Sequence, residues 1–236
     1  TRSSSGTSRA CPTPPRLPTF ESVAPFQSRP KLHSLAATTA AATAGHAAAM
    51  PVDTIVSTDV GSHKLLVGQG WTTHRARSLL MTNGLSSMGF GLPAAIGAKV
   101  SRPDAEVWTI AGDGGFQMTM PELATIKQEG LDIKIAVINN GYLGMVRQWQ
   151  EIEYGSRYSE SYMEALPDFV RLAEAYGHVG MRIERPEDVE PALRKAFTEH
   201  KDDLVFMDFI IDPAANVFPM VAAGKGLTEM ILAEDL

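Results

Sequence analysis

The sequence predicts an α/β domain of three layers, in which a parallel β-sheet is covered by helices on both faces. Short apolar runs rich in β-type residues alternate with longer stretches of helical character over residues 51–236. Strands that are buried on both faces have this nearly continuous apolar character, and the helices between them form the crossovers. With 236 residues, 44% of them hydrophobic, the chain can bury one substantial core.

The strands and helices are expected to alternate along this part of the chain. The expected strands are Thr54–Thr58, Glu106–Ala111, Ile133–Ile138, Val179–Ile183 and Leu204–Ile211. The expected helices are Leu92–Val100, Met120–Glu129, Asp168–Tyr176 and Glu187–His200, with a further helix soon after Gly141. Thr119 and Glu122 have the spacing of a capping box, which would begin the second helix. Ligands of such folds bind outside the carboxyl ends of the strands.

Residues 1–50 differ in composition from the rest of the chain. Ser, Thr, Pro and Ala dominate there, and Ala36–Met50 is mostly Ala and Thr. Such a segment has little apolar area to offset the entropy of ordering it. We therefore expect a disordered segment over 1–50, with an Ala-rich helix as an alternative near Ala36, followed by a folded domain over 51–236. We expect a cytoplasmic location. The segment is poor in acidic residues and contains Ser and Arg, which also matches an organelle transit peptide, so targeting to an organelle is the alternative.

Composition argues against several classes of protein. No apolar run approaches the ~20 residues of a membrane span. Cys11 is the single cysteine, which excludes an internal disulfide and suits a reducing compartment. The net charge is −6, and residues 1–50 hold five basic residues and one acidic residue, so the remaining chain is distinctly acidic. Without a run of Lys and Arg, nucleic acid is not expected as a partner.

Polar residues follow two successive expected strands. The strand ending at Ala111 leads into Gly112-Asp113-Gly114-Gly115, and the strand ending at Ile138 leads into Asn139-Asn140. If these strands are parallel neighbours, Asp113 and Asn140 lie at the same edge of the sheet. One anionic and one neutral oxygen donor suit Mg²⁺ or Ca²⁺ better than zinc, and the glycines let backbone N–H groups approach an anion. Taken singly, either pair could be ordinary turn residues.

These residues resemble the signature of thiamine-diphosphate enzymes. In this chain Gly112-Asp113-Gly114 and Asn139-Asn140 are separated by 24 residues, counted from Gly115. The resemblance implies that Asp113, Asn140 and the backbone oxygen of Tyr142 bind Mg²⁺, which holds the diphosphate of the cofactor. Two phosphate oxygens and a water would complete the six oxygens that Mg²⁺ prefers.

Further segments are similar to the large subunit of acetolactate synthase, over most of residues 52–235. Asp59-Val60-Gly61-Ser62-His63 resembles a segment that contacts the diphosphate, with Ser62 in place of Gln. The stretch from Gly84 to Gly97 resembles a Gly-rich loop that carries a methionine, here Met88, with Asn83 and Ser86 in place of glycines. The terminal segments 216–221 and 224–230 also match this family.

The resemblance assigns roles to individual residues. Met88 would support the bent form of the cofactor, although a methionine before a helix is more often core filler. Met145, Val146 and Trp149 would line the substrate pocket, although apolar residues four apart on one helix face are more often core. The resulting cofactor contacts are Gly61, Ser62, His63, Met88, Gly112, Gly114, Gly115, Leu143, Gly144 and Met145.

The family carries out decarboxylation of pyruvate and carboligation to a second 2-keto acid. Its activating glutamate lies on an N-terminal pyrimidine-binding domain of another subunit, and FAD binds a central domain. This sequence has no room for either domain, so we expect no catalytic side chain in this chain and no turnover by it alone. It would be a fragment, one product of a split gene or an inactive remnant of an enzyme that forms homo-oligomers. The alternatives are another thiamine-diphosphate carboligase or decarboxylase, acting on glyoxylate or sulfoacetaldehyde, and a non-catalytic cofactor-binding module.

Overall fold

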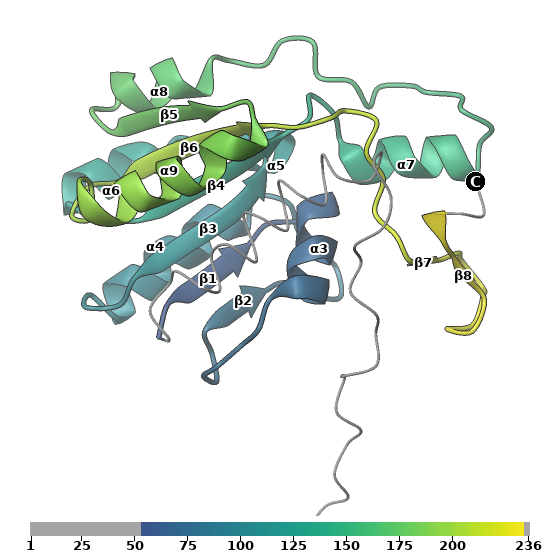
Figure 1. Ribbon diagram of the computed structural model, residues 1–236, viewed down its shortest axis with the longest axis horizontal. Coiled ribbons are helices and arrows are strands. Elements are labelled where there is room, and N and C mark those ends of the chain that lie inside the picture. The colour runs from purple at the N-terminus through teal and green to yellow at the C-terminus, as the bar shows by residue number, and fades with distance from the viewer. Residues whose placement is uncertain (1–52, 234–236) are drawn as a thin grey trace, which may run out of the picture. The chain divides into compact units, whose positions relative to one another are not determined.

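The structure is a computed structural model that describes residues 53–233. Residues 1–52 and 234–236 lie outside the described residues, and with them the segment 1–50 that we expected to be disordered. The described residues form a six-stranded, wholly parallel sheet in the order β2-β1-β3-β4-β6-β5 (Figure 1). Its strands are β1 (Ile55–Thr58), β2 (Leu79–Met81), β3 (Val107–Gly112), β4 (Lys134–Asn139), β5 (Val179–Ile183) and β6 (Val205–Ile210).

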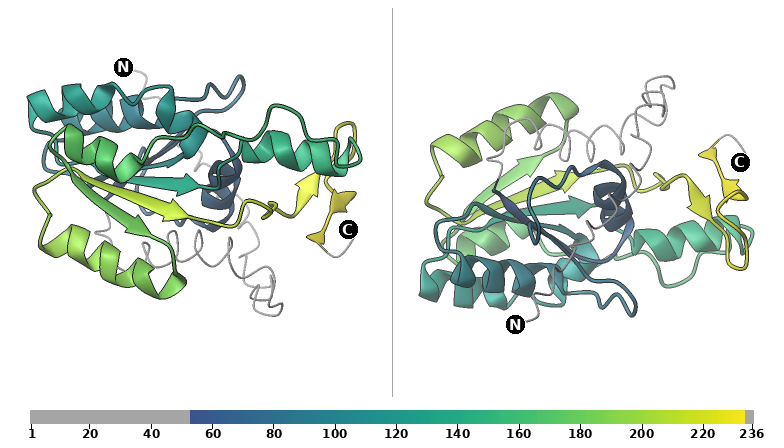
Figure 2. Two further views of the ribbon diagram at one scale, coloured as in Figure 1. Left: turned by 90° about the horizontal axis from the view of Figure 1, so that it is seen from above. Right: turned by 90° about the horizontal axis from the view of Figure 1, so that it is seen from below.

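Helices cover both faces of this sheet, as Figure 2 shows. One core cluster joins the sheet to α4 (Gly91–Ser101), α5 (Asp113–Gln117), α6 (Glu122–Glu129) and α8 (Phe169–Ala175). The other joins the opposite face to α3 (Ser62–Gly70) and α9 (Pro186–Thr198). The predicted three-layer fold is therefore confirmed. Beyond the carboxyl ends of the strands lie α7 (Gly144–Ile152) and the antiparallel pair β7 (Met220–Val221) and β8 (Met230–Ile231).

Alternation along β3 shows how one strand serves both cores. Val107 and Ala111 pack into the first cluster, whereas Trp108 and Ile110 pack into the second, and all four are buried. Side chains of a strand point alternately to its two faces, so a strand between two helical layers must be apolar at nearly every position. This requirement produced the continuous apolar runs in the sequence.

Two features of the fold differ from the sequence-based expectation. The elements β2, α3, α5, β7 and β8 were not predicted, because they are short or rich in glycine and lack a clear period. The capping box at Thr119 is wrong: the Oγ1 atom of Thr119 has no hydrogen-bond partner, and the carboxylate of Glu122 accepts a hydrogen bond from Thr125. Instead, the N–H of Glu122 donates to the carbonyl of Thr119, so the preceding turn satisfies the start of α6.

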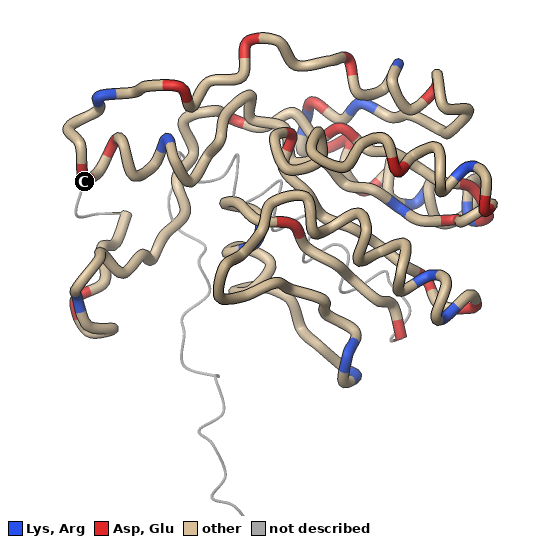
Figure 3. Tube along the Cα trace, turned by 180° about the vertical axis from the view of Figure 1, so that it is seen from behind, with Lys and Arg blue, Asp and Glu red and all other residues tan. Residues whose placement is uncertain are grey.

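Charged residues of both signs are interspersed along the described trace (Figure 3). Within residues 53–233, no helix is both long and apolar enough to cross a membrane.

Candidate functional site

The ends of β3 and β4 bring the two polar motifs together. These strands are parallel neighbours, with Gly112 in register with Ile138. Asp113 follows directly, and its Oδ2 atom accepts a hydrogen bond of 2.7 Å from the N–H of Gly141. Gly141 has a φ of 69°, a left-handed conformation that glycine adopts without strain and that turns its N–H toward the carboxylate. The predicted meeting of the two strand ends is thus confirmed.

The proposed metal donors are held in place by backbone hydrogen bonds. The Oδ1 atom of Asp113 accepts from the N–H of Gly114 at 2.8 Å, and the Oδ1 atom of Asn140 accepts from the N–H of Tyr142 at 3.0 Å. Each of these oxygens retains a lone pair for a cation. Among the described residues no three His, Cys, Asp or Glu side chains gather as metal ligands. A cation here would therefore depend on one carboxylate with amide and carbonyl oxygens, which suits Mg²⁺.

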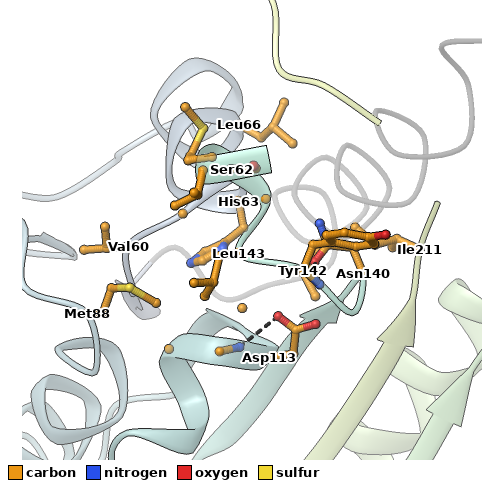
Figure 4. Close-up of a pocket in the computed structure, with 18 residues that line it drawn as sticks. Val60, Ser62, His63, Leu66, Met88, Asp113, Asn140, Tyr142, Leu143 and Ile211 are labelled. Carbon is orange, nitrogen blue, oxygen red and sulfur yellow. Dashed lines mark hydrogen bonds between the residues drawn. The ribbon is translucent and has the colours of Figure 1, made fainter. Parts of the chain in front are cut away.

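A pocket of about 210 Å³ opens over Asp113. In Figure 4, Asp113 lies beneath Leu143, with Met88 on one side and Asn140 and Tyr142 on the other. All the predicted cofactor and metal residues line this pocket, as does Val146 of the predicted substrate set. These residues are Gly61, Ser62, His63, Met88, Gly112, Asp113, Gly114, Gly115, Asn140, Tyr142, Leu143, Gly144, Met145 and Val146.

Trp149 does not line the pocket, although it was predicted beside Met145 and Val146. Its role in substrate selection stays a prediction. Conversely, the pocket includes four residues that the sequence analysis did not count among the individual cofactor, metal or substrate contacts. Three lie beside predicted site residues or at the ends of strands, where the rule for parallel sheets could have found them; Leu66, on α3, gave no such signal. The four residues are Val60, Leu66, Ile138 and Ile211.

Burial perturbs the ionisation of Asp113. The side chain is 2% exposed, and burial raises its pKa from 3.8 to about 6, against the lowering effect of hydrogen bonds from Gly114, Gly141 and Asn140. A buried carboxylate that loses water without gaining a cationic partner resists ionisation. A divalent cation beside it would supply the missing partner.

His63 lines the pocket, and one of its ring nitrogens has no hydrogen-bond partner. Its Nε2 atom is buried without a hydrogen-bond partner. Burial is the main reason that the pKa of His63 is lowered to about 4, so the imidazole is neutral at physiological pH. Buried polar atoms are rarely left unpaired in folded proteins. A ligand in the pocket with a polar group facing Nε2 would provide the partner that the protein does not.

Two glycines leave room for side chains that line the pocket. A Cβ atom on Gly144 would lie 2.9 Å from the Nδ2 atom of Asn140 and 2.9 Å from the Oγ atom of Ser62. A Cβ atom on Gly114 would lie 2.8 Å from the Cδ2 atom of Leu143. Any larger residue at either position would push these pocket side chains aside.

Asp59 positions the loop that carries Met88. Its carboxylate is 1% exposed and accepts hydrogen bonds of 3.0 Å from the N–H of Gly89 and of 3.4 Å from that of Gly91. The resemblance placed the whole segment 59–63 at the diphosphate. The structure instead directs the Asp59 carboxylate to this loop, while residues 60–63 line the pocket.

The earlier part of the same loop is held by Lys64. The Nζ atom of Lys64 donates to the carbonyl of Thr82 and, at 2.9 Å, to the hydroxyl of Ser86. Ser86, which the resemblance places at a usual glycine position, has a φ of 47° in the left-handed region. The bond from Lys64 therefore helps to hold a conformation that serine rarely adopts.

Helix α7 is fastened to the terminal segment 216–221. The buried side chain of Gln148 donates to the carbonyl of Val217 and accepts from its N–H, both at 2.9 Å. Arg147 donates to the carboxylate of Glu151 at 3.0 Å and to the Oδ1 atom of Asn216 at 3.2 Å. These bonds fix the helix face that presents Met145 and Val146 to the pocket.

No lysine or arginine is among the described residues that line the pocket, and Asp113 is its single acidic group. A diphosphate could not bind against a bare carboxylate, since the two negative charges repel. A divalent cation between them removes this repulsion. Together with the unpaired Nε2 atom of His63, the donor set fits a magnesium diphosphate.

Comparison with known proteins identifies the family of the chain. Residues 59–209 match the family model described as the thiamine pyrophosphate enzyme, C-terminal TPP binding domain, and the chain belongs to this family. It is a thiamine-diphosphate-binding domain.

The curated relatives include acetolactate synthases. The chain is 44% identical over 183 residues to the acetolactate synthase isozyme 3 large subunit of Escherichia coli (strain K12), covering 77% of this chain and 32% of that protein. It is 48% identical over 181 residues to the acetolactate synthase of Mycobacterium leprae (strain TN), covering 75% and 29%. The resemblance to acetolactate synthase large subunits is thus confirmed, and the chain spans about a third of the length of these relatives.

Proposed function

We propose that the chain binds thiamine diphosphate through Mg²⁺ and acts as the cofactor-binding part of an acetolactate-synthase-like enzyme. The observation that carries this proposal is the single buried carboxylate, Asp113, in a pocket whose described lining has no lysine or arginine. In this proposal Asp113, Asn140 and the carbonyl of Tyr142 hold the cation. The diphosphate then lies against residues 61–63 and the glycines after β3.

When bound, thiamine diphosphate would supply the nucleophile for the carbonyl of a 2-keto acid and the electron sink for loss of CO₂. The residues of this chain bind and orient the cofactor and the substrate. Met88 supports the bent form of the cofactor, while Met145 and Val146, with Trp149 nearby on α7, limit the room for the second 2-keto acid. The proposed reaction is decarboxylation of pyruvate followed by carboligation.

The volume of the pocket supports the proposal that a further domain completes the site. Pockets that enclose a whole ligand of this size have volumes of roughly 300–1,000 Å³, and this one has about 210 Å³. We propose that a pyrimidine-binding domain supplies the remaining wall and the activating glutamate, in a homo-oligomer. Without it, the chain would bind the diphosphate end of the cofactor but would not turn over.

Two experiments test the proposal. Isothermal titration of thiamine diphosphate into the chain should show binding that requires Mg²⁺ and is lost on chelation. Mixing the chain with a separately expressed N-terminal portion of a relative should restore acetolactate formation from pyruvate. Binding without activity in the mixture would favour the non-catalytic module.

The identity of the acceptor substrate distinguishes the remaining alternative, which is another thiamine-diphosphate carboligase or decarboxylase. In an active mixture, replacing Trp149 by Leu should change the preference between pyruvate and 2-ketobutyrate as acceptor. Turnover of glyoxylate or sulfoacetaldehyde in place of both would favour a different carboligase or decarboxylase.

A further inference from the structure

A buried carboxylate with no part in the proposed ligation lies next to the metal site. Asp208, on β6, is 1% exposed. The register pairs it with Val137 of β4, so Asn139, two residues further along, faces the same side of the sheet. The Nδ2 atom of Asn139 donates a hydrogen bond of 3.0 Å to the Oδ1 atom of Asp208. Asp208 therefore holds the residue that directly precedes Asn140.

This carboxylate belongs to a row of polar residues across four elements. Arg182 of β5 is in register with Asp208, and its Nε atom lies 3.4 Å from the Oδ2 atom of Asp208. A terminal nitrogen of Arg182 lies 2.8 Å from the Oδ1 atom of Asp168, which caps the start of α8. The row Asp168, Arg182, Asp208 and Asn139 thus connects α8 to the end of β4.

We propose that Asp208 is a positioning residue for the magnesium site. By holding the side chain of Asn139, it fixes the turn over residues 140–142 that presents the amide oxygen of Asn140 and the carbonyl of Tyr142 to the cation. The inference rests on the proposed function, because it requires a cation at Asp113. Outer-shell partners of this kind typically change metal affinity by roughly 10–100-fold when they are removed.

A role in folding alone predicts a different result. If Asp208 only neutralised Arg182, its replacement would lower the stability of the chain, but the folded molecules would bind Mg²⁺ as before. Metal affinity measured on folded protein therefore separates the two roles.

The test is a titration of Mg²⁺ into the chain with thiamine diphosphate present, followed by calorimetry, with circular dichroism to confirm folding. Asp208→Ala and Asn139→Ala should each weaken Mg²⁺ binding by roughly tenfold or more. Asp208→Asn retains an oxygen that can accept from Asn139, so it should lose less than Asp208→Ala. The double variant should be no weaker than the weaker single variant, because both changes break the same contact.

The matched control is Asp212→Asn, which removes an exposed carboxylate just beyond the end of β6. It should leave Mg²⁺ affinity within about twofold. Asn139→Ala removes only the donor, so it remains informative if Asp208→Ala does not fold. A change of less than about threefold in Asn139→Ala, or multiplying losses in the double variant, would overturn the role of Asp208. A failure of the unsubstituted chain to bind Mg²⁺ with the cofactor would overturn the proposed function as well.

Discussion

Replacing Asp113 by Asn is expected to stabilise the metal-free chain and to abolish its Mg²⁺-dependent binding of thiamine diphosphate. Burial raises the pKa of this carboxyl from 3.8 to about 6. A tenfold change in an acid constant corresponds to about 1.4 kcal/mol, so ionised Asp113 costs the folded state about 3 kcal/mol at neutral pH. Asparagine has the same shape and no charge, so it avoids this cost.

Hydrogen bonding offsets part of the gain. Asp113 accepts from the N–H groups of both Gly114 and Gly141. An amide has one oxygen, so the variant must direct its NH₂ group toward one of these donors and lose that bond, at about 1–2 kcal/mol. The net gain in the free energy of unfolding should therefore be about 1–2 kcal/mol at neutral pH.

The gain should depend on pH in a defined direction. The folded pKa of Asp113 lies above its unfolded value, so the cost of ionisation is fully present above about 6 and disappears as the pH falls through 3.8. The advantage of Asp113→Asn should thus shrink on acidification. At about pH 4 the lost hydrogen bond dominates, and the variant becomes the less stable protein.

Urea unfolding of both proteins with a chelator present, at about pH 7 and about pH 4, measures this difference. Asp104→Asn, at an exposed aspartate before β3, is the control and should change stability by less than about 0.5 kcal/mol. A variant less stable than the parent at neutral pH, or a difference that does not vary with pH, would refute the account of Asp113 burial. Unchanged cofactor affinity in the variant, measured calorimetrically with Mg²⁺, would remove the metal assignment.

Three further predictions concern stability measured by urea unfolding. Gly91→Ala would place a Cβ atom 3.0 Å from the backbone nitrogen of Asp59 and should lower the free energy of unfolding by about 1–3 kcal/mol. Gly97→Ala, in the same helix, meets nothing within 4 Å and should be neutral or stabilising, so equal effects of the two variants would refute the packing argument. Gln148→Leu leaves the N–H and the carbonyl of Val217 unpaired and should lower the free energy of unfolding by about 2 kcal/mol. Proteolysis of the terminal segment 216–221 should become faster, and an unchanged rate would show that other contacts hold this segment. Burial lowers the pKa of His63 to about 4, so its side chain stays neutral in the folded chain. The stability that it contributes is complete above pH 6.5 and is lost as the pH falls to about 4, by about 3 kcal/mol. His63→Gln should lack this loss of stability on acidification, and a pH profile of stability identical to that of the unsubstituted chain would contradict the prediction.

The sequence determined the layered fold and the position of the site along the chain. Its apolar runs identified five strands of the main sheet, because a strand between two helical layers has few polar positions. Gly112-Asp113 and Asn139-Asn140 follow strands β3 and β4 directly, so finding the strands was enough to place both motifs at strand ends. That the ends adjoin required only that neighbouring strands in the chain are neighbours in the sheet, which is the common arrangement.

Only the tertiary structure decided where the individual side chains point. It directed the carboxylate of Asp59 toward Gly89 and left Trp149 outside the pocket. It also joined Asp208 to Asn139 across 69 positions of sequence. The periodicity of apolar residues in the sequence indicates the backbone conformation of a residue and the face of the element on which it lies, because both depend on near neighbours in the chain. The partner of a polar side chain depends on which distant segment packs against it, and that is settled only when the whole core forms.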